Sequence, residues 1–301
     1  MSSRWIAALR SVALNLPDLA KAEQFYTDVW HLSVAARTGD AVYLRGTGSN
    51  HHLLSLHAGP QLPQIRHITL RARSAAAMAE IAQASVTAGG SIATPLGPLD
   101  DPAGGIGLTL RDPDGRQIQV VHGDKLNADE AERNDHPVRL AHVVVNAHDI
   151  PRAQSFLEQA LDFRMVDRTR IMAFMNCDRD HHSLALGDAD NDALNHIAFV
   201  MPEVESVMRG GGRMKDAGHA IEWGPGRHGP GNNAFNYFID PFGVVIEYTA
   251  DVQQIDETYR VGAPDDWKWP PGRVDHWGIS APPSARLKQA QRAVHFVPSR
   301  A

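Results

Sequence analysis

Three side chains in the C-terminal half of the chain are of the types that together hold a transition metal. His142 opens a strand-like apolar run, His196 opens another, and Glu247 lies in a late Val-Val-Ile-Glu-Tyr run. Two imidazoles and one carboxylate form the facial triad of non-haem Fe(II) sites, which leaves coordination positions open for substrate and dioxygen. The wide spacing is a weak signal by itself, because a single histidine on an apolar strand is more commonly a core residue.

An internal repeat supports the prediction of a metal site. Segments recur in the same order at an offset of about 130 residues, which is the pattern of a duplicated unit. The matching pairs are 11–16 with 141–146, 50–56 with 180–186, 66–70 with 195–199, and 110–120 with 238–248.

The two copies differ at the candidate ligands. Where the second copy has His142 and Glu247, the first has Ser11 and Gln119, although it keeps His67 at the third position. Serine and glutamine do not replace imidazole and carboxylate as ligands for this kind of metal. We therefore expect a metal only in the second copy.

A turn between two late strands brings a phenol beside the predicted ligand. The run Asp-Pro-Phe-Gly at 240–243 predicts a type I turn followed by a left-handed glycine. Counting back from this turn pairs Tyr237 with Glu247, and directly paired residues share one face of a sheet. The same count in the first copy pairs Thr109 with Gln119, so the phenol and the carboxylate are lost together.

These elements imply two similar domains. Each copy divides into two modules of strand, helix and further strands, with helices expected at 17–26 and 149–157. We place the N-terminal domain at 1–133, the C-terminal catalytic domain at 134–252, and a tail at 253–301. The three glycines 210–212 lack the Gly-Lys-Ser/Thr of a phosphate loop and are expected to form a turn.

The motifs of the second copy resemble those of type I extradiol catechol dioxygenases of the vicinal oxygen chelate superfamily. The resemblance covers roughly residues 5–250. It is carried by His142 in Leu-Ala-His-Val, His182 in His-His-Ser-Leu-Ala, His196 in Asn-His-Ile-Ala-Phe, His228 in Gly-Arg-His-Gly-Pro-Gly-Asn-Asn, and Tyr237 and Glu247 in Tyr-Phe-Ile-Asp-Pro-Phe-Gly-Val-Val-Ile-Glu-Tyr. The chain departs from many members at 229–231, where Gly-Pro-Gly replaces polar residues, so polar contacts there are not carried over.

The resemblance implies an α+β fold of four βαβββ modules, paired into two incomplete β-barrels with outer helices. It implies Fe(II), with Mn(II) as the other metal that accepts this ligand set, and O2 cleavage of a catechol beside its diol to a hydroxymuconic-semialdehyde type of product. His182 would be the acid–base residue, a role that suits imidazole near neutral pH. His228 and Tyr237 would hydrogen-bond the bound substrate oxygen. The repeat does not choose between His182 and its neighbour His181, which we expect on the opposite strand face.

Composition limits the other possibilities. The chain has 301 residues, 29 Lys and Arg, 35 Asp and Glu, and a net charge of −6, which disfavours a nucleic-acid partner. The one cysteine excludes an internal disulfide framework. With neither a signal peptide nor an apolar run long enough for a membrane span, we expect a cytoplasmic homo-oligomer. The tail tryptophans Trp267, Trp269 and Trp277 would cover the pocket, pack on the surface or form a subunit contact.

Three alternative functions stay open. A glyoxalase-like isomerase or a hydroxyphenylpyruvate-type dioxygenase could use the same modules, and a non-catalytic protein could bind small aromatics. The isomerase has no need for His182, His228 and Tyr237. The binding protein has no need for a carboxylate at position 247.

Overall fold

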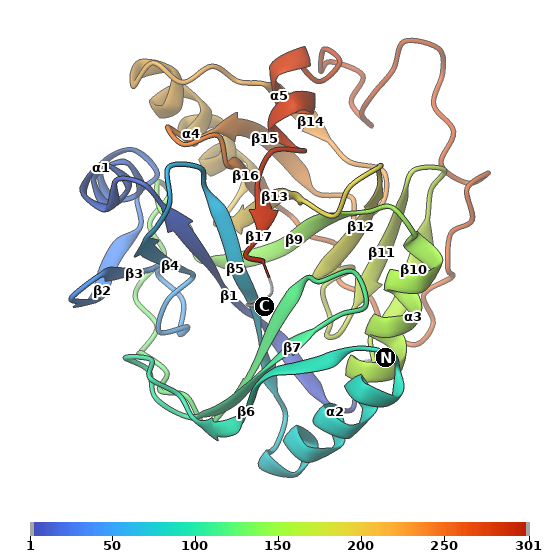
Figure 1. The fold of residues 1–301 in the computed structure, drawn as a ribbon. Coiled ribbons are helices and arrows are strands. Elements are labelled where there is room, and N and C mark those ends of the chain that lie inside the picture. The colour runs from blue at the N-terminus through green and yellow to red at the C-terminus, as the bar shows by residue number, and fades with distance from the viewer. Residues whose placement is uncertain (1–2, 299–301) are drawn as a thin grey trace.

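The computed structural model describes residues 3–298 and consists of two mixed β-sheets that flank a shared core (Figure 1). The first sheet has the strand order β2-β3-β4-β1-β5-β8-β7-β6. Its strands are β1 Ile6–Leu16, β2 Ser33–Thr38, β3 Ala41–Arg45, β4 Leu54–Ala58, β5 Gln64–Ala72, β6 Ser91–Pro98, β7 Ile106–Arg111 and β8 Gln117–His122.

The second sheet repeats this arrangement with the order β10-β11-β12-β9-β13-β16-β15-β14. The strands are β9 Arg139–Ala147, β10 Arg164–Arg168, β11 Met172–Asn176, β12 Leu184–Asp188, β13 Leu194–Val200, β14 Trp223–Arg227, β15 Ala234–Ile239 and β16 Val245–Ala250. Each sheet therefore contains two strand–helix–three-strand modules, and their first strands pair at its centre. The predicted fold class is confirmed, and neither sheet closes into a barrel.

Helices follow the first strand of every module. They are α1 Leu19–Gln24, continued by the π-helix η1 Phe25–Val29, then α2 Ala75–Thr87, α3 Ile150–Leu161 and α4 Val204–Asp216; the tail adds α5 Ala285–Ala290. The first and third begin alike, because the carboxylates of Asp18 and Asp149 accept hydrogen bonds from the backbone N–H groups of Lys21 and Arg152. Helices therefore form where the repeat predicted them.

The turn expected at residues 210–212 is wrong, since these glycines lie inside α4. A Cβ atom on Gly210 would lie 2.7 Å from the Tyr248 ring, and one on Gly211 would lie 2.9 Å from the Asn236 side chain. The helix can pack against β15 and β16 because the glycines leave room for these side chains. The close packing of α4 on these strands offsets the poor helix propensity of glycine. The sequence pattern alone does not reveal this packing.

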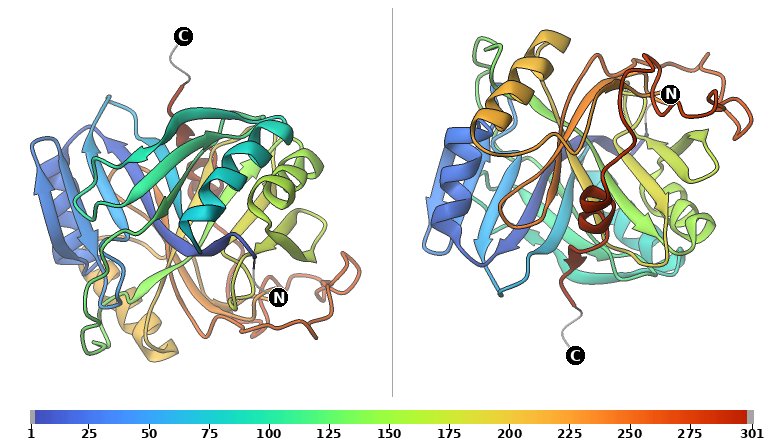
Figure 2. Two further views of the ribbon diagram at one scale, coloured as in Figure 1. Left: turned by 90° about the horizontal axis from the view of Figure 1, so that it is seen from below. Right: turned by 90° about the horizontal axis from the view of Figure 1, so that it is seen from above.

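The two domains pack extensively on each other. Helices α2 and α3 lie side by side although they belong to different domains (Figures 1 and 2). At the opposite end, the indole of Trp30 stacks on the Tyr248 ring at 3.6 Å, and the Tyr26 hydroxyl donates a hydrogen bond of 2.9 Å to Asp240. The N-terminal domain thus supports the back of the sheet that carries the predicted metal site.

The tail crosses the C-terminal sheet and returns to the N-terminal one (Figure 2). After α5, the short strand β17 His295–Phe296 pairs in parallel with β5. Val294, just before it, forms a bridge with Leu194 of β13. The tail is therefore attached to both domains. None of the helices in residues 3–298 is long and apolar enough to cross a membrane.

Candidate metal centre and its pocket

The three predicted metal ligands come together at the centre of the second sheet. His142 lies on β9, His196 on β13 and Glu247 on β16, which are neighbouring strands. The Nε2 atoms of the two imidazoles are 3.3 Å apart, and each lies 3.2 Å from Oε2 of Glu247. All three side chains are buried. Residues far apart in the chain thus present three donor atoms at the corners of a nearly equilateral triangle.

This triangle fits one face of an octahedral site. Donor atoms about 2.1 Å from an ion and at right angles to one another lie roughly 3 Å apart, close to the distances found here. Asn195 supports the fit, because its side-chain oxygen lies 2.8 Å from Nδ1 of His196. An amide oxygen only accepts, so Nδ1 carries the proton and Nε2 keeps its lone pair for an ion.

Burial and neighbouring charges set the protonation states of His196 and Glu247. Burial lowers the pKa of His196 to about 4, although Glu247 opposes the shift, so the imidazole is neutral near pH 7. Burial alone would raise the pKa of Glu247, but the imidazoles, His142 foremost, hold it well below its usual range. A neutral imidazole at His196 and a carboxylate at Glu247 are the protonation states in which such groups bind divalent metals.

A layer of amides behind the ligands was missed in the sequence. Asn195 donates from its amide nitrogen to Asn146 at 2.9 Å, and Asn146 donates to the Gln291 carbonyl of the tail, also at 2.9 Å. On the other side of the site, Asn233 donates to Thr249 at 2.7 Å and approaches Glu247 at 3.5 Å. The only signal available was an asparagine directly before His196.

The predicted acid–base residue lies against this centre. The rings of His182 and His142 are 4.3 Å apart between centroids, and His182 lines the pocket. Burial lowers the pKa of His182 well below its usual range, and His142 adds to the shift. The expected strand position is wrong, because His181 and His182 precede β12, and their Nδ1 atoms lie 3.0 Å apart instead of pointing to opposite faces.

Tyr237 and His228 form a polar pair beside the triangle. Tyr237 pairs with Glu247 across β15 and β16, as the turn predicts, and Thr109 likewise pairs with Gln119 in the other domain. The Tyr237 hydroxyl lies 3.1 Å from Nε2 of His228 and 3.4 Å from Nε2 of His196. His228 directly follows β14.

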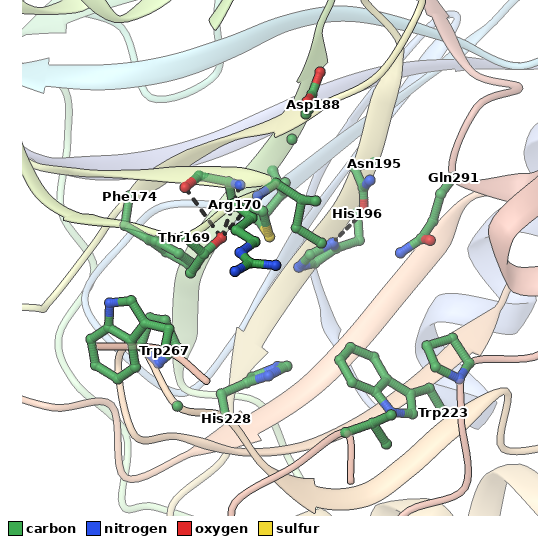
Figure 3. A pocket seen from close by; sticks show the side chains of 18 of the residues that line it. Thr169, Arg170, Phe174, Asp188, Asn195, His196, Trp223, His228, Trp267 and Gln291 are labelled. Atoms are coloured by element: carbon green, nitrogen blue, oxygen red, sulfur yellow. Dashed lines mark hydrogen bonds between the residues drawn. The ribbon is translucent and has the colours of Figure 1, made fainter. Parts of the chain in front are cut away.

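One cavity of about 640 Å³ is lined by the polar side chains of His142, His182, His196, His228 and Tyr237. In Figure 3 the side chains of Arg170, His196 and His228 converge on its middle, and Trp223 and Trp267 lie at its sides. Most of the remaining wall is apolar or aromatic. It includes Val144, Ile171, Met172, Phe174, Trp269, Val274 and Pro283. Of the three tail tryptophans, Trp267 and Trp269 belong to this wall, whereas Trp277 is 40% exposed.

The chain is similar to known proteins over most of its length. A model of the Glyoxalase/Bleomycin resistance protein/Dioxygenase superfamily matches residues 8–120 and 139–248. The chain is 29% identical over 310 residues to Metapyrocatechase 2 of Cupriavidus necator, which covers 90% of this chain and 88% of that protein.

Two solved structures have similar folds. The Mn(II)-bound glyoxalase from Novosphingobium aromaticivorans is 30% identical with a TM-score of 0.85, covering 98% of this chain and 97% of that one. Homoprotocatechuate 2,3-dioxygenase from Arthrobacter globiformis is 23% identical with a TM-score of 0.85, covering 99% and 94%. The superfamily inferred from the motifs is confirmed: the chain belongs to the Glyoxalase/Bleomycin resistance protein/Dioxygenase superfamily.

Proposed function

We propose that this protein is an extradiol dioxygenase that opens the ring of a substituted catechol with O2 at Fe(II) or Mn(II). The observation that carries the proposal is the triangle of His142, His196 and Glu247 with three further polar groups, His182, His228 and Tyr237, on the same cavity. The similarity to a metapyrocatechase over 90% of the chain supports it.

The metal would be held by the two imidazoles and the carboxylate of the triangle. Fe(II) bound there supplies open coordination positions and one-electron chemistry, both of which dioxygen reactions need. The buried site excludes water around the ligands, and Asn195 keeps the His196 ring in its binding orientation. Mn(II) accepts the same donors, and Mn(II) is the ion bound in the glyoxalase of similar fold.

The proton chemistry would fall to His182, His228 and Tyr237. Tyr237 and His228 share a hydrogen bond of 3.1 Å beside the ligands, so one catechol oxygen can bind between them. His182, on the other side of His142, would accept the proton of a substrate hydroxyl and return it when the O–O bond breaks. Burial keeps this imidazole neutral at rest and therefore able to accept a proton.

The cavity favours a catechol with a substituent. Its volume of about 640 Å³ exceeds what a bare catechol ring needs, and Phe174, Trp223 and Trp267 supply aromatic walls. Three exposed cationic side chains, Arg170, Arg273 and Lys288, also line this cavity. Both aryl-substituted and carboxylate-bearing catechols are therefore candidate substrates to test.

An oxygen-electrode screen tests the proposal. Protein purified without oxygen should hold about one Fe(II) or Mn(II) per chain, consume O2 with at least one substituted catechol, and form a yellow semialdehyde-type product. Absence of a redox metal, or of oxygen uptake across the panel, would contradict the proposal. Product identity by mass spectrometry separates cleavage beside the diol from cleavage between its hydroxyls.

An isomerase is the second candidate, because one protein of closely similar fold is named a glyoxalase. Isomerisation consumes no oxygen, so turnover of an α-ketoaldehyde–thiol adduct at unchanged O2 would favour it. The pocket argues against it, since His182, His228 and Tyr237 would then have no assigned task.

A further inference from the structure

A buried carboxylate lies behind the predicted acid–base residue. Asp167 of β10 and His181 both have no exposed surface, and Oδ2 of Asp167 lies 2.7 Å from Nε2 of His181. His181 in turn faces His182, with 3.0 Å between their Nδ1 atoms. The three side chains form a line, Asp167–His181–His182, whose last member lines the cavity.

Asp167 is fixed by contacts other than the histidine. Its Oδ1 accepts the backbone N–H of Gly262 at 2.6 Å, and its Oδ2 also accepts the Tyr259 hydroxyl at 3.0 Å. Among the described residues, no lysine or arginine pairs with this carboxylate. A buried carboxylate is costly unless it is hydrogen-bonded or neutralised. Within residues 3–298, His181 is thus the only hydrogen-bond donor to Asp167 that could carry a full positive charge.

The hydrogen bonds define which nitrogens carry protons. A carboxylate only accepts, so His181 presents N–H at Nε2 and, when neutral, a lone pair at Nδ1. That lone pair accepts from Nδ1 of His182. The Nε2 atom of His182 is then left without a proton and free for the substrate hydroxyl. Asp167 therefore determines the tautomer of a residue that it does not touch.

The first domain provides an internal comparison. It has the same pair of histidines, with Nδ1 of His51 and Nδ1 of His52 3.1 Å apart. The strand pairing of β2 with β3 matches that of β10 with β11, including the irregularity before the residue concerned. At the position of Asp167 the first domain has Ala36. The carboxylate is found in the domain that has the metal-type triangle and is missing from the other.

We propose that Asp167 and His181 are positioning residues for proton transfer by His182. They orient its ring, leave its Nε2 free, and offset the positive charge that forms when it takes up the substrate proton. The proton moves from the catechol hydroxyl to Nε2 of His182 and later leaves from the same nitrogen, so no further reactant is needed. This inference rests on the proposed ring-cleaving function, but its first test does not require activity.

Nitrogen NMR of histidine-labelled protein reads the protons directly. Loaded with Zn(II), which is diamagnetic, the wild-type protein should show His181 protonated at Nε2 only and His182 protonated at Nδ1 only. In Asp167→Asn, the amide oxygen must face the Gly262 N–H, so the amide nitrogen faces His181 and moves its proton to Nδ1. A wild-type His181 that lacks a proton at Nε2 would overturn the inference, whether or not any variant folds.

Steady-state kinetics give the second test. Asp167→Asn should keep its metal content and its KM for the catechol, while kcat falls about 10- to 100-fold, the range typical of outer partners that orient residues of a metal site. A purely structural role would instead lower the melting temperature or the metal content and raise KM. The matched control is His51→Gln in the first domain, which should leave kcat within about twofold, as expected for a side chain remote from the chemistry.

The outcomes separate the two proposals. A wild-type enzyme that cleaves catechols, together with an Asp167→Asn variant whose kcat stays within about threefold, would overturn the positioning role alone, because an orienting partner is expected to matter by tenfold or more. A wild-type protein that cleaves no catechol would overturn the proposed function. The NMR result would then still decide whether Asp167 controls the tautomer of His182.

Discussion

The two domains share a topology and a hairpin register, yet their centres contain different chemistry. In the second domain, Ala141 precedes the predicted ligand His142 on β9. In the first, the equivalent residue is Arg10, which is buried. Its Nε lies 3.0 Å from Oδ2 of Asp124, and its Nη1 lies 3.3 Å from Oδ2 of Asp101. Guanidinium–carboxylate pairs thus occupy the interior of one copy, while the other presents three donor atoms. The fold itself does not require a metal.

Replacing a ligand with the residue of the other copy should have the largest effect. Glu247→Gln keeps the shape of the side chain but removes the charge that the imidazoles stabilise. We expect metal affinity to fall by more than about 100-fold, beyond the loss typical of outer residues, together with oxygen uptake. Elemental analysis and an oxygen electrode measure both. Full activity in this variant would refute the ligand assignment, and Gln119→Glu in the first domain serves as the control.

The acid–base residue comes next. His182→Phe should keep its metal, because His182 is not one of the three donors, while kcat falls roughly 10²-fold or more. His52→Phe, the matched change in the first domain, should leave turnover as it is. Unchanged kinetics in His182→Phe would remove the residue from the mechanism. Loss of metal would instead place it among the ligands.

A smaller loss of metal affinity is expected when Asn195, which contacts the predicted ligand His196, is replaced. Asn195→Ala removes the oxygen that orients the His196 ring at 2.8 Å, and metal affinity should fall about 10-fold, within the range for such partners. Competition with a chelator measures it. The first domain carries Arg66 at this position, next to His67. An affinity equal to wild type would mean that packing alone orients the ring.

The smallest effect is expected when the ligand residue types are restored in the first domain. Ser11→His with Gln119→Glu restores the ligand types in the first domain, but the stoichiometry should stay at about one metal per chain, because the Arg10 guanidinium repels a second cation. Adding Arg10→Ala, the residue type of the other copy, removes this obstacle. If the variant that keeps Arg10 binds a second equivalent of metal, the ligand residue types alone determine whether a domain binds a metal.

The sequence predicts the fold and the meeting of His142, His196 and Glu247 because the internal repeat and the turn leave local patterns. The turn at 240–243 sets the register, and the register alone pairs Tyr237 with Glu247. Contacts between distant strands leave no such pattern. Asp167 approaches His181 from β10 and was not identified from the sequence. Trp267 reaches the cavity from the tail, a position that the sequence offered only as one of three alternatives. The orientation of His181 was wrong because both histidines precede the strand, where alternation of faces does not apply.

The return of β17 to β5 gives the N-terminal half of the chain, which lacks the His–His–Glu triangle, a structural task. The segment that contributes Trp267, Trp269 and Gln291 to the cavity is fastened at its far end by the N-terminal sheet, where Val297 donates to the Ile65 carbonyl at 2.9 Å. A catalytic copy excised from the duplication would keep its donor atoms but lose the anchor of its substrate wall. The N-terminal half thus helps to hold in place the tail segment that lines the cavity of the C-terminal half.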